Sequence, residues 1–190
     1  MPALPQPNTV SEAEYLAFEQ ASEGRHEFIN GQIIAISGAS RAHVLIVSMT
    51  VHLLISQLRG KPCEVYANDM RVKVAPSGLY TYPDVAVVCA DPQFTDDPLD
   101  TLLNPTVIVE VLSPSTEAYD RGEEFRSYRK ISTLQHYLLI AQDRPSIERY
   151  TRQPKGEWLL TEVIGINETI ALPAINCTLA LAEIYERVSF

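Results

Sequence analysis

The chain has 190 residues, of which 46% are hydrophobic and 21% charged, and its formal net charge is -9. This length favours a single domain over residues 1–190, and the composition is that of an ordinary globular protein. The acidic balance argues against tight, non-specific binding to nucleic acid, which needs a broad positive field, although one local basic strip would suffice for an enzyme that acts on DNA.

Targeting signals and cysteines give further expectations. We find no uninterrupted apolar stretch long enough to span a bilayer, and the Pro-rich residues 1–8, expected to be mobile, lack the basic and apolar regions of a signal peptide. Cys63, Cys89 and Cys177 are odd in number and far apart, which fits neither a disulfide framework nor a zinc site. We therefore expect a reducing cytoplasm and no membrane partner.

The first third of the chain predicts a helix, a hairpin and a longer helix. A helix should begin near Thr9 or Ser11, because each is followed three residues later by glutamate, as in a capping box. Asn30-Gly31 between two apolar runs predicts a hairpin with a type I′ turn. From Arg41 to Leu58 the apolar residues recur at helical spacing, and Gly60 follows as a C-terminal cap.

The rest of the chain predicts mainly strands. We expect strands over residues 63–67, 70–74 and 80–88, a loop over 90–105, and a strand over 106–112. We further expect a helix over 120–130, strands over 136–141, 147–151 and 158–164, and a closing helix over 179–188. The predicted fold class is mixed α/β (α+β), with a central mixed β-sheet flanked by helices.

Two acidic residues, Asp84 and Glu110, lie in apolar runs that are typical of buried strands. Strand alternation places Asp84 on the face of Ala86 and Glu110 on the face of Ile108, so the carboxylates converge if the strands are neighbours. A divalent cation would relieve their repulsion, lower the pKa of a bound water and neutralise charge on a phosphate under attack. Alternatively, each carboxylate meets an arginine or a backbone donor at a strand end, and spacing alone prefers neither interpretation.

Ordered motifs along more than half of the chain resemble the bacterial putative restriction endonuclease family, within the PD-(D/E)XK nuclease superfamily. They lie at residues 26–31, His43, 82–85, 109–116, 120–122, Tyr128 and 134–137. The resemblance implies a restriction-endonuclease-like core of helix, β-meander, helix and strand. It also implies Mg²⁺ or Mn²⁺ bound by Asp84 and Glu110, with Glu27 as an additional acidic group near the metal. The alternative for Glu27 is a charge at the hairpin edge that faces water. His43 either contacts substrate or packs and caps a helix, and for His43 we favour packing and capping.

The chain departs from the superfamily pattern where a lysine is expected. That lysine lies either two residues after the strand glutamate, which is Leu112 here, or one turn after Asp-Arg-Gly, which is Glu124. A lysine stabilises the charge that develops around the attacked phosphate, so its loss costs roughly two or three orders of magnitude in rate. The candidate replacements are Arg121, on nearly the same helix face as Glu124, and the strand residues Arg71 and Lys73, for each of which a solvated surface charge is the favoured alternative.

These residues support a metal-dependent endonuclease that hydrolyses DNA phosphodiester bonds and is impaired at the lysine positions. The expected catalytic residues are Asp84, Glu110, Glu124 and Arg121. Glu124 is either one more acidic metal ligand or a residue that leaves the site without its catalytic lysine. A homodimer is expected by analogy with related folds. The alternatives are a catalytically silent binding or assembly module on the same scaffold and, suggested by the net charge alone, metal-dependent hydrolysis of another substrate.

Overall fold

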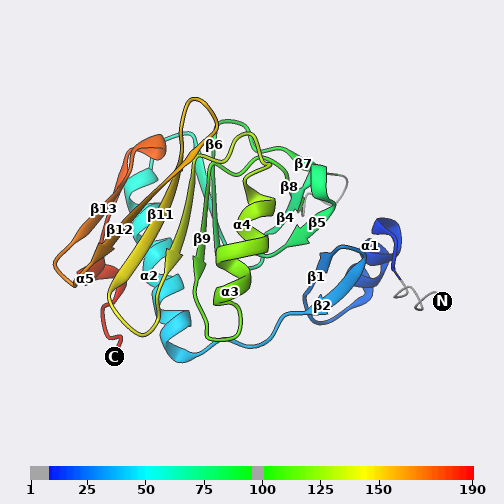
Figure 1. The fold of residues 1–190 in the computed structure, drawn as a ribbon, viewed down its shortest axis with the longest axis horizontal. Coiled ribbons are helices and arrows are strands. Elements are labelled where there is room, and N and C mark those ends of the chain that lie inside the picture. The colour runs from blue at the N-terminus through cyan, green and yellow to red at the C-terminus, as the bar shows by residue number, and fades with distance from the viewer. Residues whose placement is uncertain (1–8, 96–100) are drawn as a thin grey trace, which may run out of the picture.

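The computed structural model describes residues 9–95 and 101–190, so the expected mobility of residues 1–8 lies outside the described residues. Two six-stranded mixed sheets form the fold (Figure 1). The first sheet has the order β2 (Gln32–Ala35), β1 (His26–Ile29), β5 (Leu79–Thr81), β4 (Arg71–Val74), β8 (Thr101–Leu102) and β7 (Phe94–Thr95). The central sheet has the order β12 (Trp158–Ile164), β11 (Ser146–Arg152), β10 (His136–Ile140), β9 (Val107–Val111), β6 (Val85–Cys89) and β3 (Cys63–Ala67).

Helices cover both faces of the central sheet (Figure 1). One face packs on α2 (Arg41–Leu58), α5 (Leu181–Ile184) and the hairpin of β13 (Thr169–Leu172) and β14 (Cys177–Ala180). The other face packs on a helical segment made of α3 (Glu117–Tyr119), the π-helical turn η2 (Asp120–Glu124) and α4 (Phe125–Tyr128). Short 3-10 turns, η1 (Ala75–Ser77) and η3 (Pro173–Ile175), complete the elements. The predicted fold class is confirmed.

Alternation along the strands sorts the core into two layers. Val85 and Val109 pack in the α2 layer, whereas Ala86 and Ile108 pack in the α4 layer. All four side chains are at most 1% exposed. Glu110 shares the parity of Ile108, which directs it toward the layer that holds α4, whereas Asp84, one residue before β6, contacts His43 of α2.

Helix α2 has the length and apolar composition to cross a membrane, with a mean hydropathy of 1.3 over 18 residues, so the expectation that no stretch is long enough was wrong. In the structure its side chains Ile46, Leu54 and Leu58 are buried in the core beneath the central sheet. Core helices of globular proteins meet the same length and composition test; in α2 one face is buried, 33% of the 18 residues, whereas Val44 and Ile55 on the other face are exposed.

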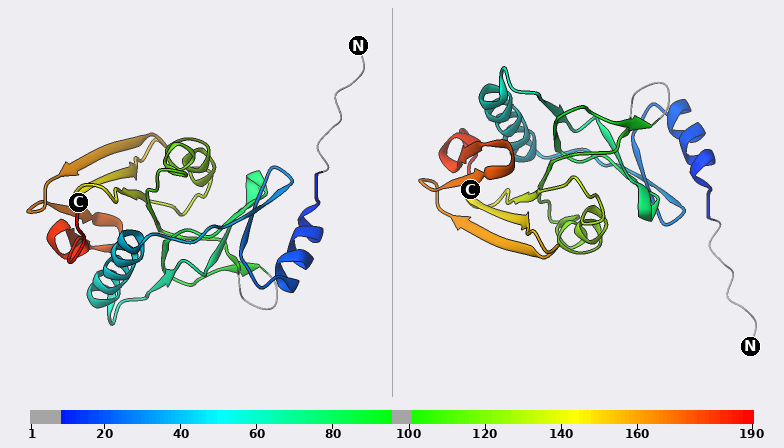
Figure 2. Two further views of the ribbon diagram at one scale, coloured as in Figure 1. Left: turned by 90° about the horizontal axis from the view of Figure 1, so that it is seen from below. Right: turned by 90° about the horizontal axis from the view of Figure 1, so that it is seen from above.

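The first sheet carries α1 (Glu12–Ala21) at one end of the molecule (Figure 2). The predicted capping box is confirmed, since Ser11 and Glu14 exchange their hydrogen bonds at the start of α1. Tyr15 of α1 stacks on Phe28 with ring centroids 5.0 Å apart. An extended segment, residues 36–40, then crosses the molecule from β2 to α2. The predicted Asn30-Gly31 hairpin is also confirmed, with both residues at positive φ.

Four predicted segments differ from the structure. The strand expected over 80–88 is two strands, β5 and β6, because Pro83 has no N–H to continue a ladder. The expected loop over 90–105 contains β7 and β8, which pair with each other. The closing helix is limited to α5 because residues 177–180 pair with β13 as β14. The helix expected over 120–130 begins earlier, at Glu117, and includes the π-helical turn η2.

A disulfide joins Cys63 to Cys89, contrary to the expectation from the cysteine pattern. The two residues are 26 positions apart in sequence but directly opposite each other where β3 pairs with β6. Sequence spacing could not reveal this register. The cysteine argument for a reducing compartment is therefore lost, and a cytoplasmic location stays a prediction.

Replacing both Cys63 and Cys89 with serine should lower the free energy of unfolding. A cross-link that closes a loop of this size restricts the unfolded chain, and its removal costs about 3 kcal/mol. Urea denaturation followed by circular dichroism measures the change. Dithiothreitol should lower the midpoint of the wild-type protein and leave that of the double variant unchanged; an unchanged wild-type midpoint contradicts the prediction.

Candidate functional site

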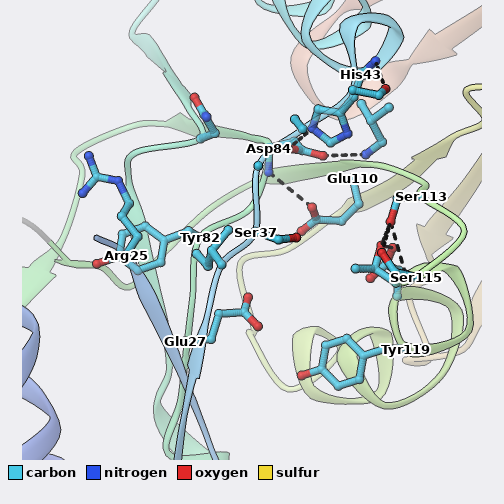
Figure 3. Close-up of a pocket in the computed structure, with 18 of the residues that line it drawn as sticks. Arg25, Glu27, Ser37, His43, Tyr82, Asp84, Glu110, Ser113, Ser115 and Tyr119 are labelled. Atoms are coloured by element: carbon cyan, nitrogen blue, oxygen red, sulfur yellow. Dashed lines mark hydrogen bonds and ion pairs between the residues drawn. The ribbon is translucent and has the colours of Figure 1, made fainter. Parts of the chain in front are cut away.

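A pocket of about 680 Å³ opens between the two sheets and contains most of the predicted site residues (Figure 3). Its walls come from β1, the crossing segment 36–40, the junction of β6 with β9, and the start of the helical segment. Six of the lining residues carry carboxylates: Glu27, Asp69, Asp84, Glu110, Asp120 and Glu124. The structure therefore brings together all the acidic residues that the sequence singled out.

Asp84 and Glu110 meet because the chain changes sheet at Pro83. Strand β6 pairs with β9 in an antiparallel register that joins Val85 to Val109 and, extended by one residue, places Asp84 opposite Glu110. The Asp84 N–H donates to Glu110 Oε2 at 3.2 Å, and the Val111 N–H donates to Asp84 Oδ2 at 2.7 Å. Convergence of the carboxylates and contact with backbone donors, posed as alternatives, thus occur together.

His43 also belongs to this pocket. It lies in the first turn of α2, and its Nε2 is 2.8 Å from Asp84 Oδ1. Gln142 Nε2 lies 3.5 Å from the other ring nitrogen and donates to the Leu112 carbonyl at 2.7 Å. His43 therefore takes part in the helix start through its N–H, which donates to Ser40, while its ring faces Asp84; contact with substrate stays untested. The sequence places His43 near the start of a helix, but only the packing of that helix in the folded chain determines which residues His43 faces.

Buried tyrosine hydroxyls donate hydrogen bonds to the two most buried glutamates of the pocket. Tyr128 donates to Glu110 Oε1 at 3.1 Å, and Tyr137 donates to Glu124 Oε2 at 3.3 Å. Both tyrosines are fully buried, and the two glutamates are 9% and 4% exposed. These contacts fix the positions of the glutamates without supplying positive charge.

Glu27 faces the same pocket from the opposite wall, not the solvent beyond the hairpin edge. The Thr81 hydroxyl donates to Glu27 and lies 3.2 Å from Glu124 Oε1, so it connects the two carboxylates. The predicted place of Glu27 near the other acids agrees with this geometry.

Burial and mutual repulsion raise the pKa values of these acids. Burial raises the pKa of Glu110 well above its usual range, and the charges of Glu124 and Asp84 add to the effect. The pKa of Glu124 is raised by burial and then by Glu27, and that of Asp120 is raised to about 6, chiefly by burial. In the described chain no lysine or arginine forms an ion pair with Glu27, Glu110, Asp120 or Glu124. The cluster therefore holds protons, or needs a cation, to remain buried.

The structure does not bring the predicted replacement cations to the pocket. Arg121 points to the other side of its helix, where it pairs with Glu117 at 3.0 Å and with Glu148. Arg71 is buried against Thr101 at 2.8 Å, and Lys73 pairs with Glu12. Of the two expected lysine positions, Glu124 lines the pocket, whereas the Leu112 side chain is 5% exposed in the core.

Arg25 is the residue that the sequence analysis missed. Among the described residues that line the pocket, it is the one arginine or lysine. Its Nε donates to Asp69 Oδ1 at 2.7 Å, and its guanidinium carbon lies 5.5 Å from the centre of the Tyr82 ring. No local pattern distinguishes Arg25 from a surface charge, but its spacing of two residues from Glu27 placed both on one side of the hairpin.

The carboxylate oxygens of the pocket are the ligands that a hard divalent cation prefers, but they do not surround one site completely. In the part of the chain that the structure describes, no three His, Cys, Asp or Glu side chains are close enough to hold a metal ion by themselves. Mg²⁺ commonly uses one or two carboxylates and keeps several waters. The adjacent Asp84 and Glu110 satisfy that requirement, and Glu110 is a buried carboxylate with no cationic partner among the described residues.

Comparison with solved structures agrees with this fold. A crystal structure from Anabaena variabilis, described as a putative nuclease belonging to DUF820, superimposes with a TM-score of 0.76 at 16% identity. The match covers 95% of this chain and 99% of the other. At this identity the match establishes the class of fold alone, a mixed α/β fold that the two proteins share.

Sequence comparison gives the family. The family model Uma2, described as putative restriction endonuclease, matches residues 12–182, and the chain belongs to this family. Two uncharacterized proteins of Synechocystis sp. are similar to it. Protein sll1609 is 40% identical over 158 residues, covering 83% of this chain and 89% of its own length. Protein slr1290 is 36% identical over 194 residues, covering 100% and 97%.

Neutralising one acid in the cluster should stabilise the protein at alkaline pH. Because the pKa values of Glu110 and Glu124 are raised in the folded state, that state binds more protons than the unfolded chain above about pH 4, the ordinary carboxyl range. The free energy of unfolding therefore falls as pH rises through the raised pKa values. In Glu124→Gln this fall should be shallower, with a gain of about 1–2 kcal/mol near pH 8 in EDTA.

Urea denaturation between pH 5 and pH 8 measures this dependence. Glu123→Gln is the matched control, because the Glu123 side chain is 72% exposed and loses the same charge outside the pocket. Equal pH profiles for the two variants would contradict the repulsive cluster.

Proposed function

We propose that this protein is a metal-dependent endonuclease that hydrolyses DNA phosphodiester bonds, with Mg²⁺ or Mn²⁺ held by Asp84 and Glu110. The observation that carries the proposal is the hydrogen bond from the Asp84 N–H to the Glu110 carboxylate, which places both acids in one pocket where Glu110 and Glu124 have no cationic partner among the described residues. Membership in a family described as putative restriction endonuclease agrees with it. When bound, the ion would activate water and neutralise charge on the phosphate.

The surrounding residues would hold the ligands in place. Asp84 is oriented from two sides, by His43 and by the Val111 N–H, and Glu110 is oriented by Tyr128. Such fixed hydrogen bonds reduce the freedom that a carboxylate must lose when it binds a metal. Glu27 stands on the facing wall, where it can bind a water of the ion or the ion itself.

The proposed reaction is slow because the position of the usual lysine carries Glu124. A carboxylate cannot stabilise negative charge that develops on the attacked phosphate. Arg121 is engaged with Glu117 and Glu148 on the far side of its helix, so it does not compensate. A catalytically silent module on the same scaffold is the alternative, and it too is favoured by Glu124.

A homodimer is part of the proposal, since two copies can cut both strands of a duplex. The edge strand β12 offers apolar surface for such contact: the exposed fractions of Leu159, Leu160 and Ile164 are 55%, 48% and 62%.

Asp84→Asn should abolish Mn²⁺-dependent nicking of plasmid DNA and weaken Mn²⁺ binding. The substitution keeps the shape of the side chain while it removes the charge that a metal requires. Gel analysis of plasmid and titration calorimetry with Mn²⁺ measure the two effects. Nicking that persists unchanged in Asp84→Asn would place the activity outside this pocket.

Glu124→Lys should raise the nicking rate by roughly two orders of magnitude or more, because it restores positive charge beside the carboxylates. Single-turnover rates with Mn²⁺ measure the gain. Glu123→Lys makes the same change of charge one residue away, on an exposed side chain, and should not raise the rate. A wild type that binds Mn²⁺ without nicking DNA, together with an inactive but metal-binding Glu124→Lys, would favour the silent module.

A further inference from the structure

We propose that Arg25, supported by Asp69 and Tyr82, forms a phosphate-binding subsite at the rim of the pocket that anchors the DNA backbone beside the bond to be cut. The inference rests on the proposed function in taking DNA as the substrate. It adds the group that lets a polyanion approach an acidic pocket.

The charge distribution of the pocket favours such a group. A DNA backbone brings one negative charge per phosphate to a pocket that six carboxylates line. A bound divalent ion offsets part of that charge at the floor, where Glu110 and Glu124 are buried. At the rim, Arg25 is the one lysine or arginine among the described lining residues, so attraction for the flanking phosphates is concentrated there.

Arg25 is built into the same walls as the carboxylates. It precedes Glu27 by two residues on the chain entering β1, which puts both side chains on one side of that strand. Tyr82, whose ring faces the guanidinium, likewise precedes Asp84 by two residues. Two short backbone segments thus link the subsite to the carboxylates. Figure 3 shows Arg25 beside Tyr82 on the same side of the pocket as Glu27.

The guanidinium is held and yet reachable by solvent. Its Nε donates to Asp69 at 2.7 Å, and the Arg25 side chain is 45% exposed. A guanidinium carries five N–H donors in a planar fork, of which the bond to Asp69 uses one. A fork fixed along one edge matches the geometry of two phosphate oxygens better than a lysine does.

Binding of a 20-base-pair DNA duplex, followed by fluorescence anisotropy with Ca²⁺ in place of Mg²⁺, tests the subsite. Arg25→Gln should weaken binding by about tenfold or more, as expected for loss of a charged hydrogen bond. It should also make the slope of log affinity against log salt concentration shallower by about 0.9, the contribution of one phosphate contact. Arg25→Lys should restore most of the slope but only part of the affinity.

Arg126→Gln is the matched control, because Arg126 is exposed, pairs with Glu123 and does not line the pocket. It should leave both affinity and slope unchanged. If Arg25→Gln fails to fold, Arg25→Lys tests the subsite instead. The subsite is supported if Arg25→Lys binds the duplex at least about threefold more weakly than wild type, and it is overturned if the affinity is unchanged.

The outcomes separate this inference from the proposed function. Arg25→Gln with wild-type affinity and slope, or a wild type that does not bind the duplex, overturns the subsite. Asp84-dependent nicking with Arg25-independent binding leaves the proposed function standing without the subsite. Arg25-dependent binding with no nicking by wild type or Glu124→Lys supports the subsite and rejects the proposed endonuclease.

Discussion

The arrangement of the pocket depends on one interruption of backbone hydrogen bonding. The ladder of the first sheet ends at Thr81, two residues before Pro83, and the chain enters the central sheet at Val85, two residues after it. That crossing places Asp84 just before the start of β6, opposite Glu110 on β9, and it also leaves Tyr82 on the wall beside Arg25. A continuous strand would have kept residues 80–88 in one sheet, and no cavity would have opened between the two. The site is therefore a property of the junction, not of either sheet alone.

The cost of this arrangement is electrostatic. Glu110 and Glu124 are buried together, and their pKa values rise because neither water nor a basic side chain of the described chain compensates their charge. Tyr128 and Tyr137 satisfy hydrogen bonds but leave the charge in place. A chain selected only for stability would fill such a position with apolar residues. Retained repulsion of this kind is typical of sites that bind a cation or exchange a proton.

Much of the fold followed from local patterns. The amphipathic spacing of α2, the Asn30-Gly31 turn and the alternation around Glu110 each have one physical reading, and all were predicted correctly. The errors came from interactions between distant residues. The pairing of Cys63 with Cys89 depends on the register of β3 against β6, and the pairing of β14 with β13 overrode a helical pattern. Neither register is encoded in a short window of sequence.

The candidate site divides in the same way. Asp84, Glu110 and Glu27 could be named because motif order marked them, and the structure places them around one pocket. Arg121 was chosen for its helix face, but Glu117 and Glu148 hold it elsewhere. His43 and Arg25 were undervalued or missed because their importance depends on what α2 and β1 face, which only the folded chain determines.

The wall that carries Glu27 comes from the hairpin of β1 and β2, and the wall that carries Asp84 comes from the junction of β5 with β6. Strands β1 and β5 pair through a single residue couple, Phe28 with Tyr80, and the extended segment 36–40 connects the hairpin to α2. A molecule that contacts Glu27 on one wall and Asp84 on the other would connect the two walls and restrict their relative motion. Part of the binding free energy would then offset the entropy lost when the hairpin is held against the core. Binding in the pocket would therefore make the hairpin of β1 and β2 more rigid, and a more rigid hairpin would bind the molecule more tightly.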